Sequence, residues 1–406
     1  MPGPLNGYRI VDLTAMVSGP SATMLLADQG ADVIKVEPAG GDHTRAAANR
    51  RGGYAAAFLN NNRGKRSVVL DLKSPAGVEA LKRIAAGADV FVQNFRPGVV
   101  DRMGIGEADI RAVREDIIYV SICGFGHSGP YAAKPVYDPL IQALSGLASV
   151  QGGSDHARPR LVRTILPDKL TGVVAAQAIS AALLARHNTG RGDHIRLSML
   201  DAVVAFLWGS DMGSQTFVGD ELPQQDAASF IDLIYETTDG HISVAVQTDR
   251  EWEALCGALQ RPDWLEDERF RTPELRQRNI DERLALTQSV LASDSAANWL
   301  ERLEKASVPC APVLTRAQMI EHPQVRENAI VMESDHPQAG RLRQARPAAR
   351  FSEHHPDGQR GAPGLGAHTR EVLAEAGYDY EAVEDLLASG TARDGQNEPP
   401  GRNERD

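Results

Sequence analysis

The stretch Leu161–Leu184, LVRTILPDKLTGVVAAQAISAALL, decides how the rest of the chain is interpreted. Its alternating apolar run breaks at Pro167, Asp168 follows, and KLTG then leads into a helix of small residues. We expect Asp168 at a strand-to-helix corner, where backbone N–H groups and the positive end of the helix dipole converge. A carboxylate held there is ionised at neutral pH and can act as a nucleophile. The alternative is a helix cap, with the Asp168 side chain accepting from the N–H of Leu170 or Thr171.

Upstream of this stretch, apolar strands alternate with helices. A helix is predicted after Ser18-Gly19-Pro20, and another begins at Pro75, which suits the first turn of a helix. Short apolar segments predict five strands, at 8–13, 31–36, 66–72, 89–93 and 117–122. This alternation predicts an α/β fold, a Rossmann-like large domain in which helices cover a parallel sheet.

The pattern changes near residue 220. A hairpin is predicted at 230–246, helices follow, and 309–313 looks like a returning strand, so we expect a smaller α+β domain. A helix at 368–376 indicates a return to the large domain. The predicted division is a large domain at 1–205, a linker at 206–224, a small domain at 225–325, a linker and return at 326–390, and a disordered tail at 391–406.

Composition excludes several classes of protein. The net charge of -11 argues against binding nucleic acid through a general basic field. The three cysteines are far apart in sequence and the eleven histidines show no metal-ligand spacing, so we expect no disulfide framework and no metal. The N-terminus lacks the form of a signal peptide, and the longest apolar run, at 173–185, has about a dozen residues, fewer than a membrane span needs. We therefore expect a cytoplasmic protein with no membrane or nucleic-acid partner.

The first strand is not followed by a dinucleotide fingerprint. The turn after it reads TAMVSGP rather than GxGxxG, and no Walker A motif occurs. An NAD or FAD enzyme, the usual interpretation of such a sheet, is therefore not supported.

Short motifs follow one another in a fixed order along the chain. They are MVSGP at 16–20, LDLK at 70–73, NFRPG at 94–98, DRMG at 101–104, GFG at 124–126, GPY at 129–131, KPVYD at 134–138, Asp168 with TG at 171–172, GRGD at 190–193 and GAHT at 366–369. The series resembles family III coenzyme A transferases, the group that includes formyl-CoA and carnitine CoA-transferases, from about Leu5 to Ser389.

This resemblance implies coenzyme A as a substrate, with no permanently bound cofactor. Coenzyme A carries several phosphate charges, so its site requires cations around a crevice at the strand ends. Four cations follow predicted strands or lie in loops: Lys73, Arg96, Arg102 and Lys134. By resemblance, Lys73, Arg102 and Lys134 match positions that the family uses around the cofactor. The alternative for each is a solvated surface charge.

The resemblance also assigns the apolar and amide contacts. Asn94 and Phe95 match a loop near the pantetheine arm, and Val17 and Ser18 match a loop beside the thioester. Leu70 would pack near the adenine, the alternative being an ordinary leucine of the strand core.

Asp168 falls on the catalytic aspartate of the family. By similarity, its carboxylate forms an acyl-aspartyl anhydride and then an aspartyl-CoA thioester, through which CoA passes from an acyl-CoA to a free carboxylic acid. The resemblance further implies a homodimer whose two chains interlock. Two departures are visible: some members have glutamine where this chain has Val17, and nothing at 219–240 resembles the glycine-run loop that covers the aspartate in the formyl-CoA enzymes.

Two other functions stay open. A 2-methylacyl-CoA racemase of the same superfamily needs a His-Asp pair, but this chain has Tyr137-Asp138, and we interpret His127 as a loop residue. A non-catalytic CoA-binding protein would tolerate the loss of Asp168.

Overall fold

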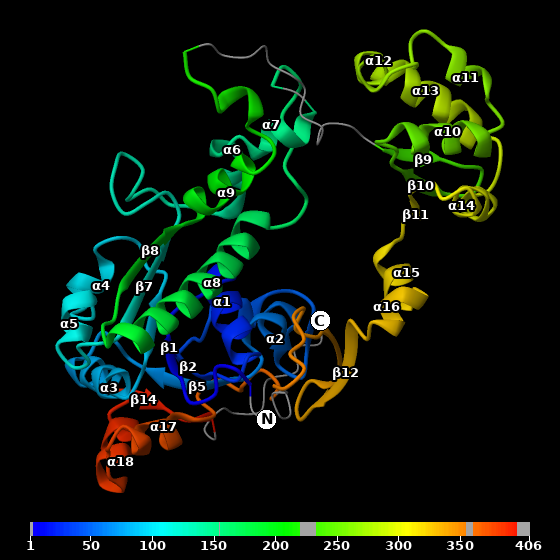
Figure 1. Cartoon of the computed structure of the whole chain (residues 1–406). Helices are drawn as coiled ribbons and strands as arrows, with labels where there is room; N and C mark the ends of the chain where they lie inside the picture. The colour runs from blue at the N-terminus through cyan, green and yellow to red at the C-terminus, as the bar shows by residue number, and fades with distance from the viewer. Residues whose placement is uncertain (1–2, 154, 220–232, 355–359, 396–406) are drawn as a thin grey trace. The chain divides into compact units, whose positions relative to one another are not determined.

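The computed structural model describes residues 3–153, 155–219, 233–354 and 360–395. Contacts divide the chain into two compact units. The larger combines Met1–Ala227 with Val331–Asp406, and the smaller is Ala228–Ile330. The larger unit is therefore assembled from both ends of the chain, coloured blue to green and orange to red in Figure 1. The finer division into linkers stays a prediction.

A seven-stranded sheet forms the centre of the larger unit, in the order β14-β5-β2-β1-β6-β7-β8. All neighbours are parallel except β14, which runs antiparallel to β5. The parallel, helix-covered sheet confirms the predicted fold class. The strands are β1 (Arg9–Asp12), β2 (Asp32–Glu37), β5 (Lys65–Leu70), β6 (Val90–Gln93), β7 (Ile118–Cys123), β8 (His194–Ser198) and β14 (Ala392–Arg393).

Two of these strands correct the sequence analysis. β8 reads HIRLS and is too polar to stand out as a buried strand. β14 lies in the segment that was predicted to be a disordered tail, but Ala392 is buried and pairs with Leu70. The prediction was wrong there because a two-residue edge strand gains its stability from the sheet rather than from its own sequence. Residues 396–406 lie outside the described part.

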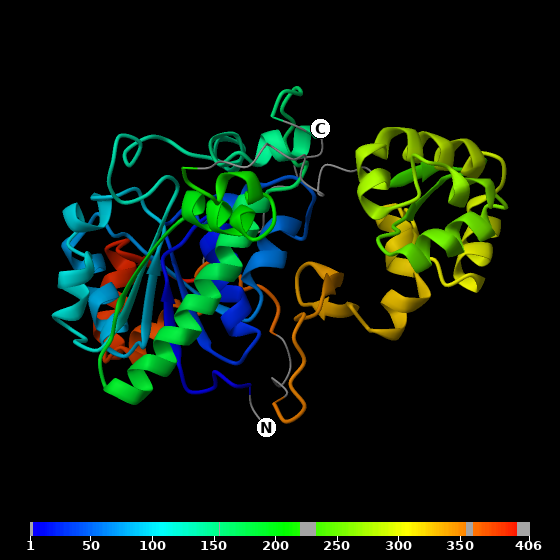
Figure 2. The same cartoon turned by 45° about the horizontal axis from the view of Figure 1, so that its top comes forward.

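Helices cover both faces of this sheet because the strand side chains alternate between two apolar cores. Ile10 packs with α1 and α8, whereas the adjacent Val11 packs with the helices of the opposite face. Figure 2 shows α1 and α8 side by side along one face. The helices are α1 (Ser18–Ala27) and α8 (Leu166–Thr189) on one face, and α3 (Pro75–Ala86), α4 (Val99–Arg102), α5 (Glu107–Arg111), α17 (Thr369–Glu375) and α18 (Tyr380–Ala388) on the other.

Helix α17 confirms the helix predicted at 368–376. Ion pairs from Arg66 of β5 to Glu371 and Glu375 attach this helix to the sheet.

The remaining elements of the larger unit are short. They are β3 (Arg50–Arg51), β4 (Tyr54–Ala55), α2 (Ala56–Asn62), α6 (Asp138–Leu144), α7 (Leu147–Gly152), α9 (Met199–Trp208), the hairpin of β12 (Val331–His336) and β13 (Gly340–Ala345), and two 3-10 turns at His43–Ala46 and Gly213–Gln215.

The smaller unit is α+β. Its three-stranded antiparallel sheet confirms the predicted hairpin, except for residues 230–232, which lie outside the described part, and confirms the returning strand. Trp252, Trp264 and Trp299 lie in its core. The elements are β9 (Ile234–Glu236), β10 (His241–Val244), β11 (Cys310–Pro312), α10 (Asp249–Ala258), α11 (Asp263–Glu266), α12 (Pro273–Arg278), α13 (Ile280–Leu291) and α14 (Ala296–Lys305), followed by α15 (Arg316–Glu321) and α16 (Pro323–Glu327).

Helix α8 is longer than its apolar run predicted. It has 24 residues and, by length and composition alone, is long and apolar enough to cross a membrane. Core helices of soluble proteins pass the same test. One side of α8 packs against α1 and the sheet, with Ala175, Ile179 and Leu183 buried there.

Candidate active site

The carboxyl ends of the six parallel strands meet at one edge of the sheet, which we call the carboxyl edge. Ser18 follows β1, Lys73 follows β5, Asn94 follows β6 and Lys134 follows β7. Loops at this edge form the ligand crevice of an open α/β fold. The structure therefore gathers segments from four separate parts of the sequence at one edge.

Asp168 is the third residue of α8 and is partly buried. Residues 161–165, before the helix, form no strand, so the predicted strand-to-helix corner is wrong. The predicted alternative is also wrong, because the N-cap is Ile165 and no side-chain cap hydrogen bond is formed. Pro167 explains why the helix begins here, since proline fits the first turn but not the middle of a helix. The Asp168 carboxylate is thus left available for a partner outside its own helix.

That partner is Ser18, the first residue of α1. The hydroxyl and backbone N–H of Ser18 face the Asp168 carboxylate as hydrogen-bond donors and favour its charged form. Helix α1 has no acidic residue in its first turn and no side-chain cap, so Asp168 supplies the negative charge that its N-terminus favours.

Gly172 makes this meeting possible. It lies one turn after Asp168, on the same side of α8. A Cβ atom at Gly172 would lie 2.1 Å from Ser21 Oγ and 2.9 Å from the Ser18 carbonyl oxygen. Only glycine lets α8 approach α1 this closely, and the close approach places Asp168 over Ser18.

Gly172→Ala is expected to separate the two helices. Overpacking of this kind costs about 1–3 kcal/mol of the free energy of unfolding. Thermal melts measure this loss. Val173→Ala is the control, because the Val173 side chain is 56% exposed on the same helix and its loss should change stability by less than about 0.5 kcal/mol. Equal melting temperatures of the two variants would contradict the close packing.

The pKa of Asp168 is raised from its ordinary value to about 6. Burial is the largest cause, and the negative charge of Asp138 adds to it, while the hydrogen bonds from Ser18 act in the opposite direction. Asp168 is therefore a carboxylate at neutral pH, as predicted, but it is easier to protonate than a solvated one. Partial desolvation of this kind leaves an anion that is more reactive than one in water.

Asp138 is a neighbour that sequence reasoning did not identify. It is buried at the start of α6, and its Oδ2 atom accepts a hydrogen bond from the Asp168 backbone N–H at 3.2 Å. Gln142 donates to its Oδ1 atom at 2.7 Å. Asp138 thus fixes the first turn of α8, and its charge acts on the Asp168 side chain. The adjacent Tyr137 is 69% exposed.

Comparison with known proteins shows the family to which the chain belongs. A model of CoA-transferase family III matches residues 5–369. The chain belongs to this family. Succinyl-CoA:glutarate CoA-transferase from Mus musculus is 36% identical over 399 residues, which are 95% of this chain and 90% of that protein. Formyl-CoA:oxalate CoA-transferase from Escherichia coli O157:H7 is 32% identical, with 94% and 98% of the two chains covered.

Solved structures support the same assignment. The crystal structure of a CAIB/BAIF family protein from Brucella suis superposes with a TM-score of 0.80 at 31% identity, covering 93% of this chain and 100% of the other. These similarities confirm the predicted family and enzyme class: the chain is a family III CoA-transferase, whose substrates are CoA thioesters. Since the relatives are named as transferases, the racemase alternative is not favoured.

The loops after β1 and β6 are joined in this family III transferase by Asn94. Its side-chain oxygen accepts from Ala15 N–H at 3.0 Å, and its amide nitrogen donates to the Ala15 carbonyl at 2.8 Å. Phe95 is partly buried against the apolar core, and its N–H donates to the side chain of Gln93. Val17 is the N-cap residue of α1, directly beside Ser18. These residues form one connected wall of the carboxyl edge.

The predicted cofactor cations are exposed. Lys73 precedes α3, Arg96 follows β6, and Arg102 ends α4. The Lys134 ammonium lies 3.2 Å from the centre of the Tyr131 ring, a cation–π contact. Exposure leaves these charges accessible to phosphate groups, and their roles stay predictions.

Leu70 ends β5 at the carboxyl edge, but its side chain points into the core. Its side chain is 1% exposed within the apolar core and its strand position is paired with β14. This is the environment of an ordinary core leucine, so a contact with adenine would require the backbone at this position.

The described residues include no group of three or more histidine, cysteine or acidic side chains that could hold a metal ion. Cys123 is buried, which raises the pKa of its thiol and makes it a poor nucleophile. The segment predicted to lack a glycine-rich lid, 219–240, lies mostly outside the described residues.

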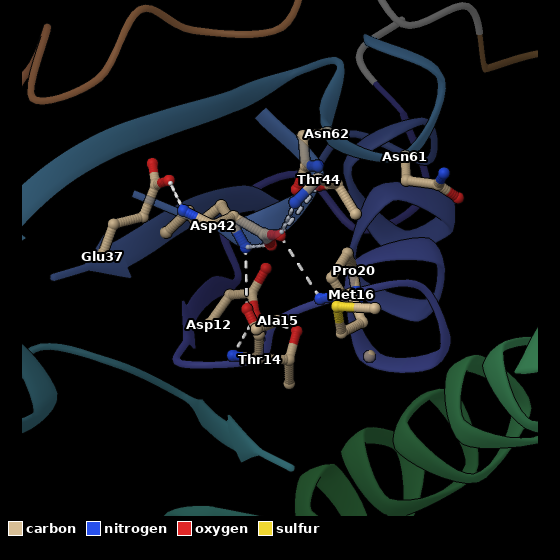
Figure 3. A network of polar contacts seen from close by, with 12 residues as sticks. Asp12, Thr14, Ala15, Met16, Pro20, Glu37, Asp42, Thr44, Asn61 and Asn62 are labelled. Carbon is tan, nitrogen blue, oxygen red and sulfur yellow. Dashed lines mark hydrogen bonds and ion pairs between the residues drawn. The ribbon is translucent and has the colours of Figure 1, made fainter. Parts of the chain in front are cut away.

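Sequence reasoning also missed four buried charges that pack against the loop after β1, residues 14–20. We call these four residues the buried ion network: Asp12, Lys35, Asp42 and Lys65. Figure 3 shows Asp12 and Asp42 together with Thr14 and Met16 of the loop. Lys65 pairs with Asp12 at 2.9 Å and Lys35 with Asp42 at 3.0 Å. For two of them, Asp12 and Lys35, the signal in the sequence was a charge within an apolar strand segment, RIVDL and DVIKV.

Proposed function

We propose that this family III transferase moves coenzyme A from an acyl-CoA to a free carboxylic acid, with Asp168 as nucleophile. The observation that carries the proposal is a partly desolvated carboxylate at the carboxyl edge, held by two donors at the start of α1. A carboxylate needs no general base to act as a nucleophile, because it is already ionised. Its environment alone can therefore activate it.

The reaction proceeds through two anhydrides. The Asp168 carboxylate attacks the thioester carbonyl, the C–S bond breaks, and CoA leaves as a thiolate. The thiolate attacks the aspartyl carbonyl of the anhydride, which releases the donor acid and leaves an aspartyl-CoA thioester. The acceptor carboxylate attacks this thioester, a second anhydride forms, and attack by the thiolate on the acceptor carbonyl regenerates Asp168.

Each of these attacks passes through a tetrahedral oxyanion that requires hydrogen-bond donors. The first-turn N–H groups of a helix have no intrahelical acceptor. The N–H groups of Ser18 and Gly19 in α1, and that of the N-cap residue Val17, are the proposed donors, because Ser18 faces the Asp168 carboxylate. The hydroxyl and N–H of Ser18 would donate to the Asp168 carboxylate before the attack, and to the oxyanion of the tetrahedral intermediate after it.

The exposed cations at the carboxyl edge are the proposed contacts for the CoA phosphates. Lys73, Arg96, Arg102 and Lys134 provide local positive charge on a chain whose net charge is -11. Asn94 and Phe95 would line the pantetheine arm. We also retain the prediction of a cytoplasmic, interlocked homodimer.

The names of the relatives suggest the acids. The mouse and human relatives are succinyl-CoA:glutarate CoA-transferases, and another, from Agrobacterium fabrum, is a succinate–glutarate CoA-transferase. We therefore propose short dicarboxylic acids as donor and acceptor.

The test is a CoA-exchange assay read by mass spectrometry. Purified protein is incubated with succinyl-CoA and a pool of free acids that includes glutarate, oxalate and acetate. New acyl-CoA species, with glutaryl-CoA prominent, are the expected result. Loss of stereochemical purity in a 2-methylacyl-CoA without exchange would instead indicate the racemase. CoA binding with neither reaction would indicate a binding protein and refute the proposal.

A further inference from the structure

The buried ion network has no evident value for stability. Asp12, Lys35 and Lys65 are at most 1% exposed, and Asp42 is 4% exposed. Removing charges from water costs several kcal/mol per ion, which the ion pairs only partly recover, so apolar residues of similar volume usually give equal or greater stability. Buried charges in a core are therefore expected to fix a specific geometry.

The geometry that they fix is that of the β1 loop, residues 14–20. The Lys35 ammonium donates to the Thr14 carbonyl at 2.7 Å, and the Lys65 ammonium donates to the Pro20 carbonyl at 2.9 Å. The two lysines thus hold the two ends of the loop.

The two carboxylates of the network accept hydrogen bonds from backbone N–H groups of the same loop. Asp12 Oδ1 accepts from the Thr14 N–H at 2.8 Å, and Asp42 Oδ1 accepts from the Met16 N–H at 3.4 Å. The second oxygen of Asp12 also accepts from the Thr23 hydroxyl, inside α1, at 2.7 Å. Together with the bonds of the two lysines, these contacts connect the loop and the helix that follows it to β1, β2 and β5. Figure 3 shows Asp12 and Asp42 beside Thr14 and Met16.

The backbone of the loop needs this support. Met16 has a φ of 71°, a left-handed conformation that is unfavourable for a side chain of its kind. A Cβ atom at Gly19 would lie 2.3 Å from Thr14 Cβ, so the loop turns back closely on itself. Strained segments persist only where surrounding interactions over-determine them.

We propose that the buried ion network is a positioning device for the nucleophile: it holds loop 14–20 so that the two donors of Ser18 face Asp168. Lys35, Asp42 and their partners are then positioning residues, since they touch neither Asp168 nor a substrate. This inference rests on the proposed function for its kinetic consequences, but its structural part can be measured without turnover.

A charge-balanced variant tests the proposal. In Lys35→Met/Asp42→Asn the donor to the Thr14 carbonyl is lost, while position 42 keeps an oxygen for the N–H groups of Met16 and Thr44. The net charge does not change. Asp138 of α6 and Asp201 of α9, the acidic residues in the first turns of two helices packed against α8, also stay in place. A direct electrostatic effect on Asp168 is therefore small.

The matched control removes another buried ion pair at the opposite end of α1. Arg63 binds the C-cap residue Asp28 through two hydrogen bonds, of 2.8 and 2.5 Å. Arg63→Met/Asp28→Asn makes the same kind of change about 15 Å away along the helix axis, as the rise of about 1.5 Å per residue gives. A purely structural role predicts similar behaviour of the two double variants.

The expected results differ between them. In the network variant, kcat falls about 10- to 100-fold with KM values within about threefold, and the low-pH limb of activity moves to higher pH because the Ser18 bonds no longer favour the carboxylate. Adding Ser18→Ala to this variant should lower kcat by a smaller factor than it does in the wild type, since both changes weaken the same interaction between Ser18 and Asp168. The control variant should keep kcat within about twofold of the wild-type value, with its low-pH limb at the wild-type pH, even where its melting temperature is lower.

A measurement without turnover separates this inference from the proposed function. The gain in melting temperature of Asp168→Asn over its parent grows as the pH rises above the pKa of the unfolded chain and levels off at the pKa of Asp168 in the folded protein, so the pH at which it levels off reports that folded-state pKa. If that pH rises in the network background but not in the control background, the inference stands even for a protein that exchanges no CoA. If neither that pH nor kcat differs between the two double variants, the inference is overturned.

Discussion

Asp168→Ala and Asp168→Asn are expected to reduce the rate of CoA exchange at least about 10³-fold, because the proposed covalent intermediates form on the Asp168 carboxylate. Affinity for CoA, measured by calorimetry, should stay within a few fold, since the proposed phosphate contacts lie on other elements. Hydroxylamine added to wild-type protein and an acyl-CoA should convert the activated aspartyl group into a hydroxamate. Peptide mass spectrometry would locate this modification at Asp168.

The control for this loss is Glu381→Gln, an exposed acidic residue in the first turn of α18. It should change the exchange rate by less than about twofold. Exchange that persists within tenfold in Asp168→Ala, or a hydroxamate at another residue, would contradict the assignment of the nucleophile.

The same substitution carries a stability signature. Because the pKa of Asp168 is raised to about 6, the unfolded chain releases its proton at lower pH than the folded one, and ionisation costs stability as the pH rises through this range. At pH 8 the full cost is present, so Asp168→Asn should be more stable than the wild type, by about 1–2 kcal/mol after allowance for solvent screening. At pH 3.5 the gain should vanish. A group kept for catalysis at the expense of stability behaves in this way.

Sequence patterns predicted the parts of the fold whose signals are local. Five buried strands were apparent because Ile, Val and Leu cluster in short runs, and Pro75 placed the start of one helix. β8 and β14 were missed because their stability comes from neighbouring strands rather than from their own composition. A long-range pairing leaves no trace in a two-residue strand.

The site shows the same division. Asp168 stood out because an acidic residue after proline begins a long helix of small residues. Ser18 was assigned beside the thioester only through the family resemblance, and Asp138 was not assigned to the site. Both are far away in sequence and reach Asp168 only through the packing of α8 on α1 and α6. Gly172 is the residue from which this packing could have been suspected, because a glycine inside a helix costs stability unless close approach requires it. The raised pKa of Asp168 follows from this assembly and could not be predicted from the helix alone.

Activity is expected to fall as the pH decreases through about 6, because protonation removes the nucleophilic carboxylate. Burial is the main cause of the raised pKa of Asp168, and the negative charge of Asp138 is the second. Asp138→Asn should therefore lower the pKa of Asp168 and move the low-pH limb of kcat/KM downward by roughly half a pH unit or more. Profiles recorded between pH 4.5 and 8, with a stable acyl-CoA donor, measure this shift.

Asp138→Asn also replaces a hydrogen-bond acceptor by a donor at position 138, so a second variant is required. Asp138 accepts from both Gln142 and the Asp168 N–H, so the amide of Asp138→Asn places a donor against one of these donors. In Asp138→Asn/Gln142→Glu, the carboxylate at 142 can accept from this amide and still accept from the Val162 N–H, as Gln142 does at 2.9 Å. This double variant restores the bond between positions 138 and 142, although the donors to the Val162 and Thr164 carbonyls are lost. It keeps a negative charge nearby, so its limb should return toward that of the wild type. A limb that moves upward in the single variant would mean that Asp138 stabilises the Asp168 carboxylate through the geometry of the first turn of α8 more than it opposes ionisation through its charge.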